Sequence, residues 1–214
     1  MMSKQTKILL IIALVVAVIA VVLIKLKGQF TIENEKSNPD SGSVNVPGSS
    51  TPFVLPGQPT PYIQVDPDFY QFYSNLSIKN FSASEVLFKG NSHESAGSSA
   101  YGLNSDPPQE KWKNIIETIK ILDQFRDFIG LPIKLTSVYR NKQYNAKIGG
   151  ESESKHMDFN AIDFKVLGSE PQSTYAIHLQ TWRDNGLFTG GLKAYDEEEF
   201  IHIDTRGVNA DWSI

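Results

Sequence analysis

The chain begins with an apolar segment that a water-soluble domain would struggle to bury. Residues 8–24 form an unbroken apolar run of 17 residues. As a helix rising about 1.5 Å per residue, such a run spans roughly 25 Å, which is close to the thickness of a bilayer core. It passes directly into Lys25 and Lys27 without the small residues of a signal-peptidase site. We therefore expect residues 1–27 to form an uncleaved, single-pass signal-anchor helix.

The segment that follows the apolar run has the composition of a linker. Residues 28–65 are rich in Ser, Pro, Gly, Asn and Thr, so they bury too little apolar surface to offset the entropy of ordering. A flexible chain of this length reaches on the order of 35 Å. Residues 66–214 remain, which is a suitable length for one domain with one core.

Composition excludes several classes of protein. The chain contains no cysteine, which excludes a disulfide scaffold. Its net charge of −4 and the lack of a basic stripe argue against a nucleic-acid partner.

Lysines flank the apolar run on both sides and barely decide its orientation, but the short amino-terminal tail favours a domain outside the cytoplasm. The sequence does not indicate an oligomeric state.

Apolar periodicity within residues 66–214 predicts an α+β domain. Apolar residues recur at helical spacing from Trp112 to Ile129, and Gly130 ends this helix. Phe125 and Phe128 are expected in its buried face. A small, mostly antiparallel sheet with flanking helices is expected to follow. The strands of this sheet are predicted at 133–137, 161–166, 191–195 and 200–204. Two further helices are predicted at 141–147 and 174–185.

Two histidines and one aspartate are candidate metal ligands. His156 and Asp163 are seven residues apart, which suits a loop that leads into a strand. His202 lies in an alternating segment that is typical of a half-buried strand, so two neighbouring strands could direct Asp163 and His202 to one point. Two imidazoles and a carboxylate commonly hold a catalytic zinc ion and leave its fourth position to water. On spacing alone, an ordinary core or surface histidine remains the alternative.

An ordered series of motifs surrounds these candidates. The motifs are Thr136-Ser137-Val138-Tyr139-Arg140, Tyr144-Asn145, Gly149-Gly150, Ser154-x-His156, Ala161-x-Asp163 and the strand that carries His202. This series resembles the zinc D-Ala-D-Ala carboxypeptidase and endolysin-type peptidoglycan peptidases, which are related to lysostaphin and hedgehog-type zinc peptidases. The resemblance covers about residues 78–214 and implies that the three candidates bind Zn²⁺.

The resemblance also implies roles for residues around the metal. Glu199 precedes His202 by three residues, as does the general base of some relatives, and Arg140 matches an arginine that holds a substrate carboxylate or polarises a carbonyl. Asp204 and Asp196 are alternative bases. Asp204 could instead accept a hydrogen bond from one of the metal-binding histidines and so orient its ring.

The remaining positions near the metal are less defined. Ser154 is expected to be a loop hydroxyl or a substrate contact, and Tyr139 either packs below the cleft or touches substrate. The acidic run 196–199, which includes Glu199, is also consistent with an ordinary solvated loop.

Phe159 departs from the family pattern, which usually has glycine between the first two ligands. Phenylalanine is costly at this position if the backbone takes a positive φ. We expect either a rearranged loop or an aromatic residue that lines a modified substrate cleft.

Together these features predict a membrane-anchored zinc peptidase that cuts the peptide stems or cross-bridges of bacterial peptidoglycan. Carboxypeptidase and endopeptidase action are not distinguished. The domain is expected on the periplasmic or cell-wall side, or on a virion membrane if the protein is phage-encoded. Two alternatives stay open: a non-catalytic wall-binding anchor of the same fold, and a phage virion or lysis peptidase.

Overall fold

The computed structural model of this chain describes residues 65–211. The predicted signal-anchor helix and the linker up to residue 64 lie outside the described residues, so those predictions stay untested. Within residues 65–211, no helix is long and apolar enough to cross a membrane.

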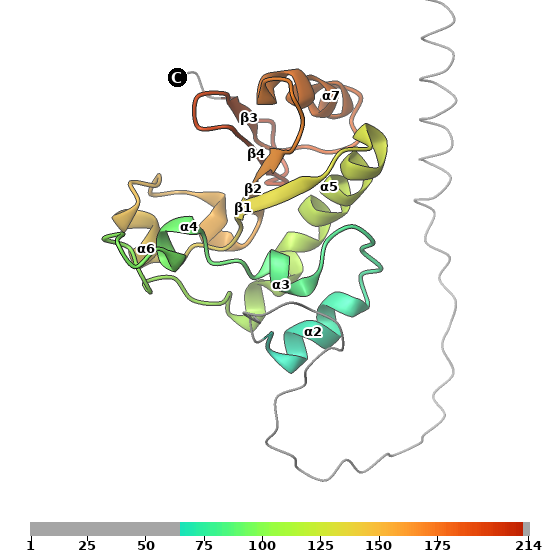
Figure 1. The fold of residues 1–214 in the computed structure, drawn as a ribbon. Helices are drawn as coiled ribbons and strands as arrows, with labels where there is room; N and C mark the ends of the chain where they lie inside the picture. Colours follow the sequence, from blue (N-terminus) through green and yellow to red (C-terminus); the bar gives the residue numbers. More distant parts are fainter. Residues whose placement is uncertain (1–64, 212–214) are drawn as a thin grey trace, which may run out of the picture. The chain divides into compact units, whose positions relative to one another are not determined.

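A four-stranded sheet forms the centre of the described unit (Figure 1). Its spatial order is β1-β2-β4-β3, and every neighbouring pair is antiparallel. The prediction of an α+β domain with a small antiparallel sheet is confirmed. The strands are β1 (Ile133–Ser137), β2 (Ala161–Val166), β3 (Leu192–Tyr195) and β4 (Phe200–Asp204).

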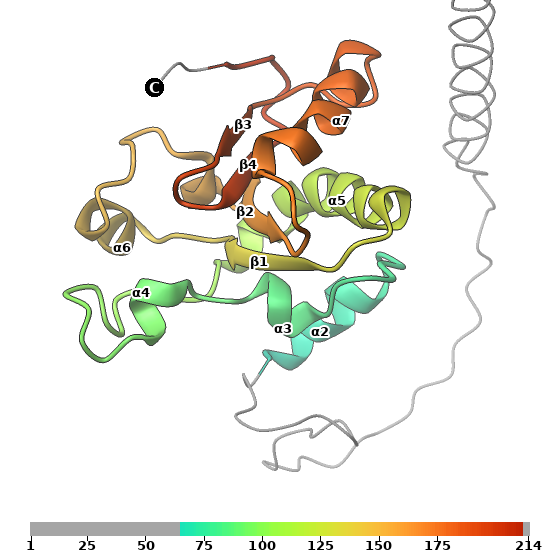
Figure 2. The ribbon, with the colours of Figure 1, turned by 45° about the horizontal axis from the view of Figure 1, so that its top comes forward.

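One face of the sheet is apolar and carries the core. Two helices, α5 (Ile116–Ile129) and α7 (Gln172–Asp184), pack on this face and lie on the same side of the strands in Figures 1 and 2. Phe125 of α5 meets Phe164 of β2 edge to face, with ring centres 6.1 Å apart. Each large side chain buried in this way contributes about 1.5–3 kcal/mol. The strand residues buried there are Ile162, Phe164, Ile201 and Ile203.

The long helix begins differently from the prediction. Its first turns, Gln109–Ile115, form a 3₁₀ helix (η1) that continues into α5, and the helix ends at Gly130 in the left-handed conformation. The prediction that Phe128 belongs to the core was wrong, because its side chain is 52% exposed. It lies at the rim of the helical layer, where its ring packs edge to face against His178 and Trp182 of α7.

Shorter helices lie around the strands, and Figures 1 and 2 show α4 and α6 on the side away from α5 and α7. Phe69 of α2 packs edge to face on Trp112 of η1. The side chain of Asn141 caps α6 by accepting from the Tyr144 amide at 2.8 Å. The short helices are α2 (Pro67–Ser74), α3 (Ala83–Val86), α4 (Asn91–Glu94), α6 (Lys142–Lys147) and η2 (Lys155–Asp158).

Candidate metal centre

Two of the predicted ligands meet through strand pairing. Asp163 on β2 lies directly opposite His202 on β4, and opposed residues of antiparallel strands point to the same side of the sheet. Nδ1 of His202 lies 2.8 Å from Oδ1 of Asp163. The sequence-based prediction that two neighbouring strands direct these side chains to one point is confirmed.

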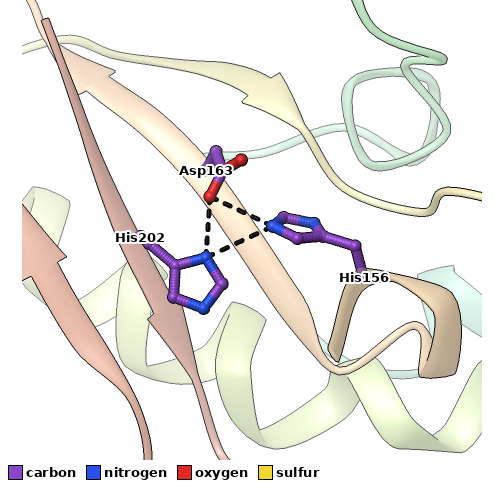
Figure 3. Close-up of side chains that lie close together, drawn as sticks. All are labelled: His156, Asp163 and His202. Carbon is purple, nitrogen blue, oxygen red and sulfur yellow. Dashed lines mark hydrogen bonds and ion pairs between the residues drawn. The ribbon is translucent and has the colours of Figure 1, made fainter. Parts of the chain in front are cut away.

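His156 completes the group from η2, a short turn rather than an open loop (Figure 3). Its Nε2 atom lies 3.0 Å from Oδ1 of Asp163 and 3.2 Å from Nδ1 of His202. Ligand atoms of a tetrahedral zinc ion are about 3.3 Å apart, given zinc–ligand distances of roughly 2.0–2.2 Å. The three atoms therefore need only a small outward shift to hold a zinc ion, and their chemistry suits it.

Outer hydrogen bonds set which ring nitrogen of each histidine faces the metal position. Nδ1 of His156 donates to the Val138 carbonyl at 2.7 Å, and Nε2 of His202 donates to Oδ2 of Asp204 at 3.0 Å. This leaves Nε2 of His156 and Nδ1 of His202 directed at the third ligand, Asp163. Such outer partners fix the tautomer and the ring orientation of a metal-binding histidine.

Asp204 is therefore an outer partner of the site, one of the two roles expected for it. It is fully buried and also accepts hydrogen bonds from the Gly191 amide and the Arg206 side chain. Burial raises the pKa of its carboxyl group, but the bonds from Arg206 and His202 outweigh burial and hold that pKa well below its usual value. The Asp204 carboxylate is thus ionised, and both of its oxygens already accept hydrogen bonds from these donors.

Burial shapes the protonation of the three candidate ligands, whose exposed fractions are 2% for His156, 5% for Asp163 and 8% for His202. Burial lowers the pKa of His156, which favours the neutral ring that binds metal. For His202, burial acts in the same direction, but hydrogen bonds to Asp163 and Asp204 outweigh it and raise the pKa. Burial raises the pKa of Asp163, yet the two imidazoles hold it well below its ordinary value.

Arg140 contacts a candidate ligand directly. Its Nη2 atom pairs with Oδ2 of Asp163, and its Nε donates to Oγ of Ser137 at 2.7 Å. The Arg140 amide donates to the His156 carbonyl at 3.2 Å. Arg140 thus connects the end of β1 to both the loop ligand and the strand ligand.

Phe159 takes the backbone conformation that its position in the family suggests. Its φ is 55°, in the left-handed region, which costs an ordinary residue about 1–2 kcal/mol. Its ring is fully buried and lies 6.2 Å from the Phe69 ring and 6.0 Å from the Tyr139 ring. The expectation that it lines a substrate cleft was wrong. Burial of the ring, worth about 1.5–3 kcal/mol, offsets the backbone strain.

Three side chains of η1 and α5 hold the segment 155–160, here called the metal loop. These loop-anchoring residues are Lys111, Asn114 and Thr118. They donate to three carbonyl groups of the metal loop at 2.5, 2.8 and 2.8 Å. Their spacing of three and four residues places them along one side of the helix. The sequence alone does not reveal these anchors, because ordinary polar helix residues give no signal of a partner 40 or more residues away.

Glu199 lies in the turn before β4, and among the described residues no hydrogen bond or ion pair joins it to the three candidate ligands. Its φ is 57°, and its Oε2 atom lies 2.7 Å from Nζ of Lys165. Lys165 follows Asp163 by two residues on β2, so both side chains point to the same side of the sheet. The Glu199 carboxylate is therefore held on the metal-bearing face by Lys165, a partner that the sequence does not reveal.

The other predicted positions lie at the margin of the site. Asp196 accepts a hydrogen bond at 2.8 Å from the amide of Ser173, in the first turn of α7. Ser154 immediately precedes η2 and is half-buried. Tyr139 packs against Phe159, and burial raises the pKa of its hydroxyl.

A comparison with protein families gives this arrangement a context. The family model for peptidase M15 matches residues 80–204, which is more than half of the 214-residue chain. The chain belongs to the peptidase M15 family. The matched segment of this M15 domain contains the three candidate ligands, Arg140 and Glu199, so the resemblance recognised from motifs is confirmed. A comparison with curated proteins found no match.

Proposed function

We propose that this M15 domain is a zinc-dependent peptidase that hydrolyses peptide bonds of bacterial peptidoglycan, as a D-Ala-D-Ala carboxypeptidase or an endopeptidase. The main support is the convergence of His156, Asp163 and His202 at one buried point within the family match. A zinc ion bound there would polarise a substrate carbonyl and lower the pKa of a bound water.

Glu199 is the proposed general base. Its carboxylate lies on the metal-bearing face, is 65% exposed, and is oriented by Lys165. The alternatives are less suitable, because Asp204 is buried under its own hydrogen-bond donors and Asp196 bonds to the start of α7. A base has to be within hydrogen-bond reach of the water that attacks, and an exposed carboxylate in a turn can approach it when substrate binds.

Arg140 has two proposed tasks. It holds the second oxygen of Asp163, which directs the first oxygen toward the histidines. A guanidinium carries five N–H donors in a planar fork, so Arg140 retains donors for a substrate carboxylate or a developing oxyanion while it holds Asp163 and Ser137.

We also propose that residues 8–24 anchor the protein in a membrane and that residues 28–65 tether the M15 domain on the outer side. The unbroken apolar run and the linker composition support this arrangement. It would give the domain access to peptidoglycan while keeping it at the membrane surface.

The central test is a Glu199→Gln substitution in the full-length, zinc-loaded protein. We expect hydrolysis of purified peptidoglycan fragments, followed by mass spectrometry, to fall by roughly 10²–10⁴-fold, because the variant lacks a proton acceptor. Zinc content should stay equal to that of the wild type, since Glu199 is not a ligand. Glu197→Gln is the matched control in the same exposed turn and should retain activity.

The two ways in which this proposal can fail are distinct. Near-normal activity of Glu199→Gln would remove Glu199 as the base and leave the peptidase intact. A wild-type protein that binds zinc but cleaves no peptidoglycan fragment would favour the non-catalytic wall-binding alternative.

A further inference from the structure

An aromatic and cationic surface continues from the metal centre along the β3–β4 hairpin. It consists of Lys193 and Tyr195 on β3 and Phe200 on β4, here called the hairpin strip. Lys193 is the cross-strand partner of His202, and Tyr195 is the partner of Phe200. Opposed residues of antiparallel strands share a side, as do residues two apart on one strand. The hairpin strip therefore lies on the same face as the candidate metal ligands.

The side chains of the hairpin strip are organised but not buried in the core. The rings of Tyr195 and Phe200 stack with their centres 4.4 Å apart and their planes 15° apart. Nζ of Lys193 lies 4.8 Å from the centre of the Tyr195 ring, within the range of a cation–π contact. All three residues are partly exposed, whereas their strand neighbours Ala194 and Ile201 pack on the opposite, core side.

Ion pairing distinguishes Lys193 from Lys165, which is one of two other lysines on this face, the second being Lys134 on the edge strand β1. Lys165 forms an ion pair with Glu199 at 2.7 Å. In the part of the chain that the structure describes, no carboxylate lies within ion-pair distance of Lys193 Nζ. An ammonium group supported by a ring and lacking an anionic partner is suited to receive a carboxylate from a ligand.

The spacing along the strand indicates which part of a ligand would reach it. Tyr195 lies two residues beyond Lys193, which is about 7 Å along a strand. Lys193 is paired with His202, but its ammonium group lies over the Tyr195 ring. The ammonium is therefore displaced from His202 along the strand by about 7 Å, toward the turn of the hairpin. Two residues of an extended peptide cover the same length. A carboxylate two residues from the cleaved bond would therefore meet Lys193.

We propose that the hairpin strip is a substrate subsite for an extended peptide that carries a free carboxylate two residues from the scissile bond. Lys193 pairs with that carboxylate, and the stacked rings of Tyr195 and Phe200 pack against the aliphatic part of the peptide. This inference rests on the proposed function. In a peptidoglycan stem cleaved between its two terminal D-alanines, the second residue before that bond is the diamino acid. When this residue is diaminopimelate it carries such a free carboxylate, and its amidated form lacks the charge.

The test compares two synthetic stem pentapeptides that differ only in this carboxylate, free in one and amidated in the other. For the full-length, zinc-loaded wild type, we expect kcat/KM to be about five- to tenfold higher for the free acid, mainly through KM, as for a partly exposed charged hydrogen bond. Lys193→Met should abolish this preference, so that the acid and the amide are hydrolysed with similar kcat/KM. Lys193→Arg should keep the preference.

Lys120→Met is the matched control, because it removes the same charge from an exposed position on α5, on the opposite side of the sheet. It should leave the preference intact. Equal hydrolysis of the two peptides by the wild type, or a preference that survives in Lys193→Met, would overturn the subsite while leaving the peptidase in place.

A binding measurement separates failure of the subsite from failure of the proposed function. Calorimetric titration of the two pentapeptides into the zinc-loaded Glu199→Gln protein gives their affinities without requiring hydrolysis. A Lys193-dependent preference for the acid in this titration, together with a wild-type protein that cleaves neither peptide, would keep the subsite and reject the peptidase. Equal affinity for both peptides would reject the subsite.

Discussion

The two halves of the metal centre are built in different ways. Asp163 and His202 stand on paired strands, where backbone hydrogen bonds and register determine their separation. His156 stands on a 3₁₀ turn whose position depends on side chains from elsewhere: the loop-anchoring residues and the buried ring of Phe159. The sheet half is held mainly by backbone, and the loop half mainly by side chains.

This difference shows where the site is vulnerable. A strand pair keeps its geometry through most changes of neighbouring side chains, because every residue supplies the same backbone groups. A loop held by three donated hydrogen bonds and one aromatic ring depends on the identity of each donor. Substitutions around His156 should therefore weaken metal binding while the sheet remains folded.

The largest expected effect comes from removing the ligands themselves. His156→Ala and His202→Ala should each lower zinc affinity by more than the 10–100-fold typical of outer-partner substitutions, measured by metal analysis after gel filtration. In metal-free protein the two should differ. His202→Ala removes one donor from each of two buried carboxylates, Asp163 and Asp204, and should cost about 1–3 kcal/mol more in unfolding free energy than His156→Ala. Equal losses would contradict the distinction between the two halves.

Phe159 provides a test of the loop half that depends on which of two variants is the more stable. Phe159→Ala and Phe159→Gly should both destabilise the metal-free protein by about 2–4 kcal/mol, because each leaves a cavity between Phe69 and Tyr139. The glycine variant should be the more stable of the two by about 1 kcal/mol, since only glycine relieves the positive φ. Urea unfolding followed by tryptophan fluorescence measures both. An alanine variant as stable as the glycine variant would show that the backbone strain is negligible.

The smallest expected effect concerns a single loop anchor. Thr118→Val keeps the side-chain shape but leaves the Asn160 carbonyl without its donor, at a cost of about 1–2 kcal/mol. Zinc affinity should fall by several-fold to about tenfold, measured by competition with a chelator. Thr181→Val is the matched control, because the Thr181 hydroxyl is exposed and bonds only within its own helix. The two variants should behave alike if the anchors do not position the metal loop.

Much of the sheet could be predicted because its signals are local. Alternating apolar residues mark β1, β2 and β4 with the bounds that the structure shows, and the ordered motifs indicated the family. The cross-strand meeting of Asp163 and His202 could also be expected, because strand period two allows few arrangements. The short helices α2, α3 and α4 were not predicted, since four to eight residues carry too little periodicity.

The errors and omissions arise from contacts between distant segments. Phe128 has helical spacing typical of a core residue, but the neighbouring helix covers only part of its ring. Lys165 and the loop-anchoring residues are polar side chains whose partners become apparent only in the folded chain. The strain at Phe159 was anticipated from the family pattern, but the aromatic cluster that compensates it was not.

The opposed positions of Asp163 and His202 have a consequence for the energetics of the whole protein. These residues are 39 positions apart in the sequence, so they are neighbours only when β2 and β4 have paired. The unfolded chain therefore offers no equivalent three-ligand site, and a bound zinc ion would stabilise the native state through mass action. Each tenfold rise in free zinc above the dissociation constant would then add about 1.4 kcal/mol to the free energy of unfolding. Folding and metal uptake would act as a single linked equilibrium, in which zinc supply controls the amount of folded protein.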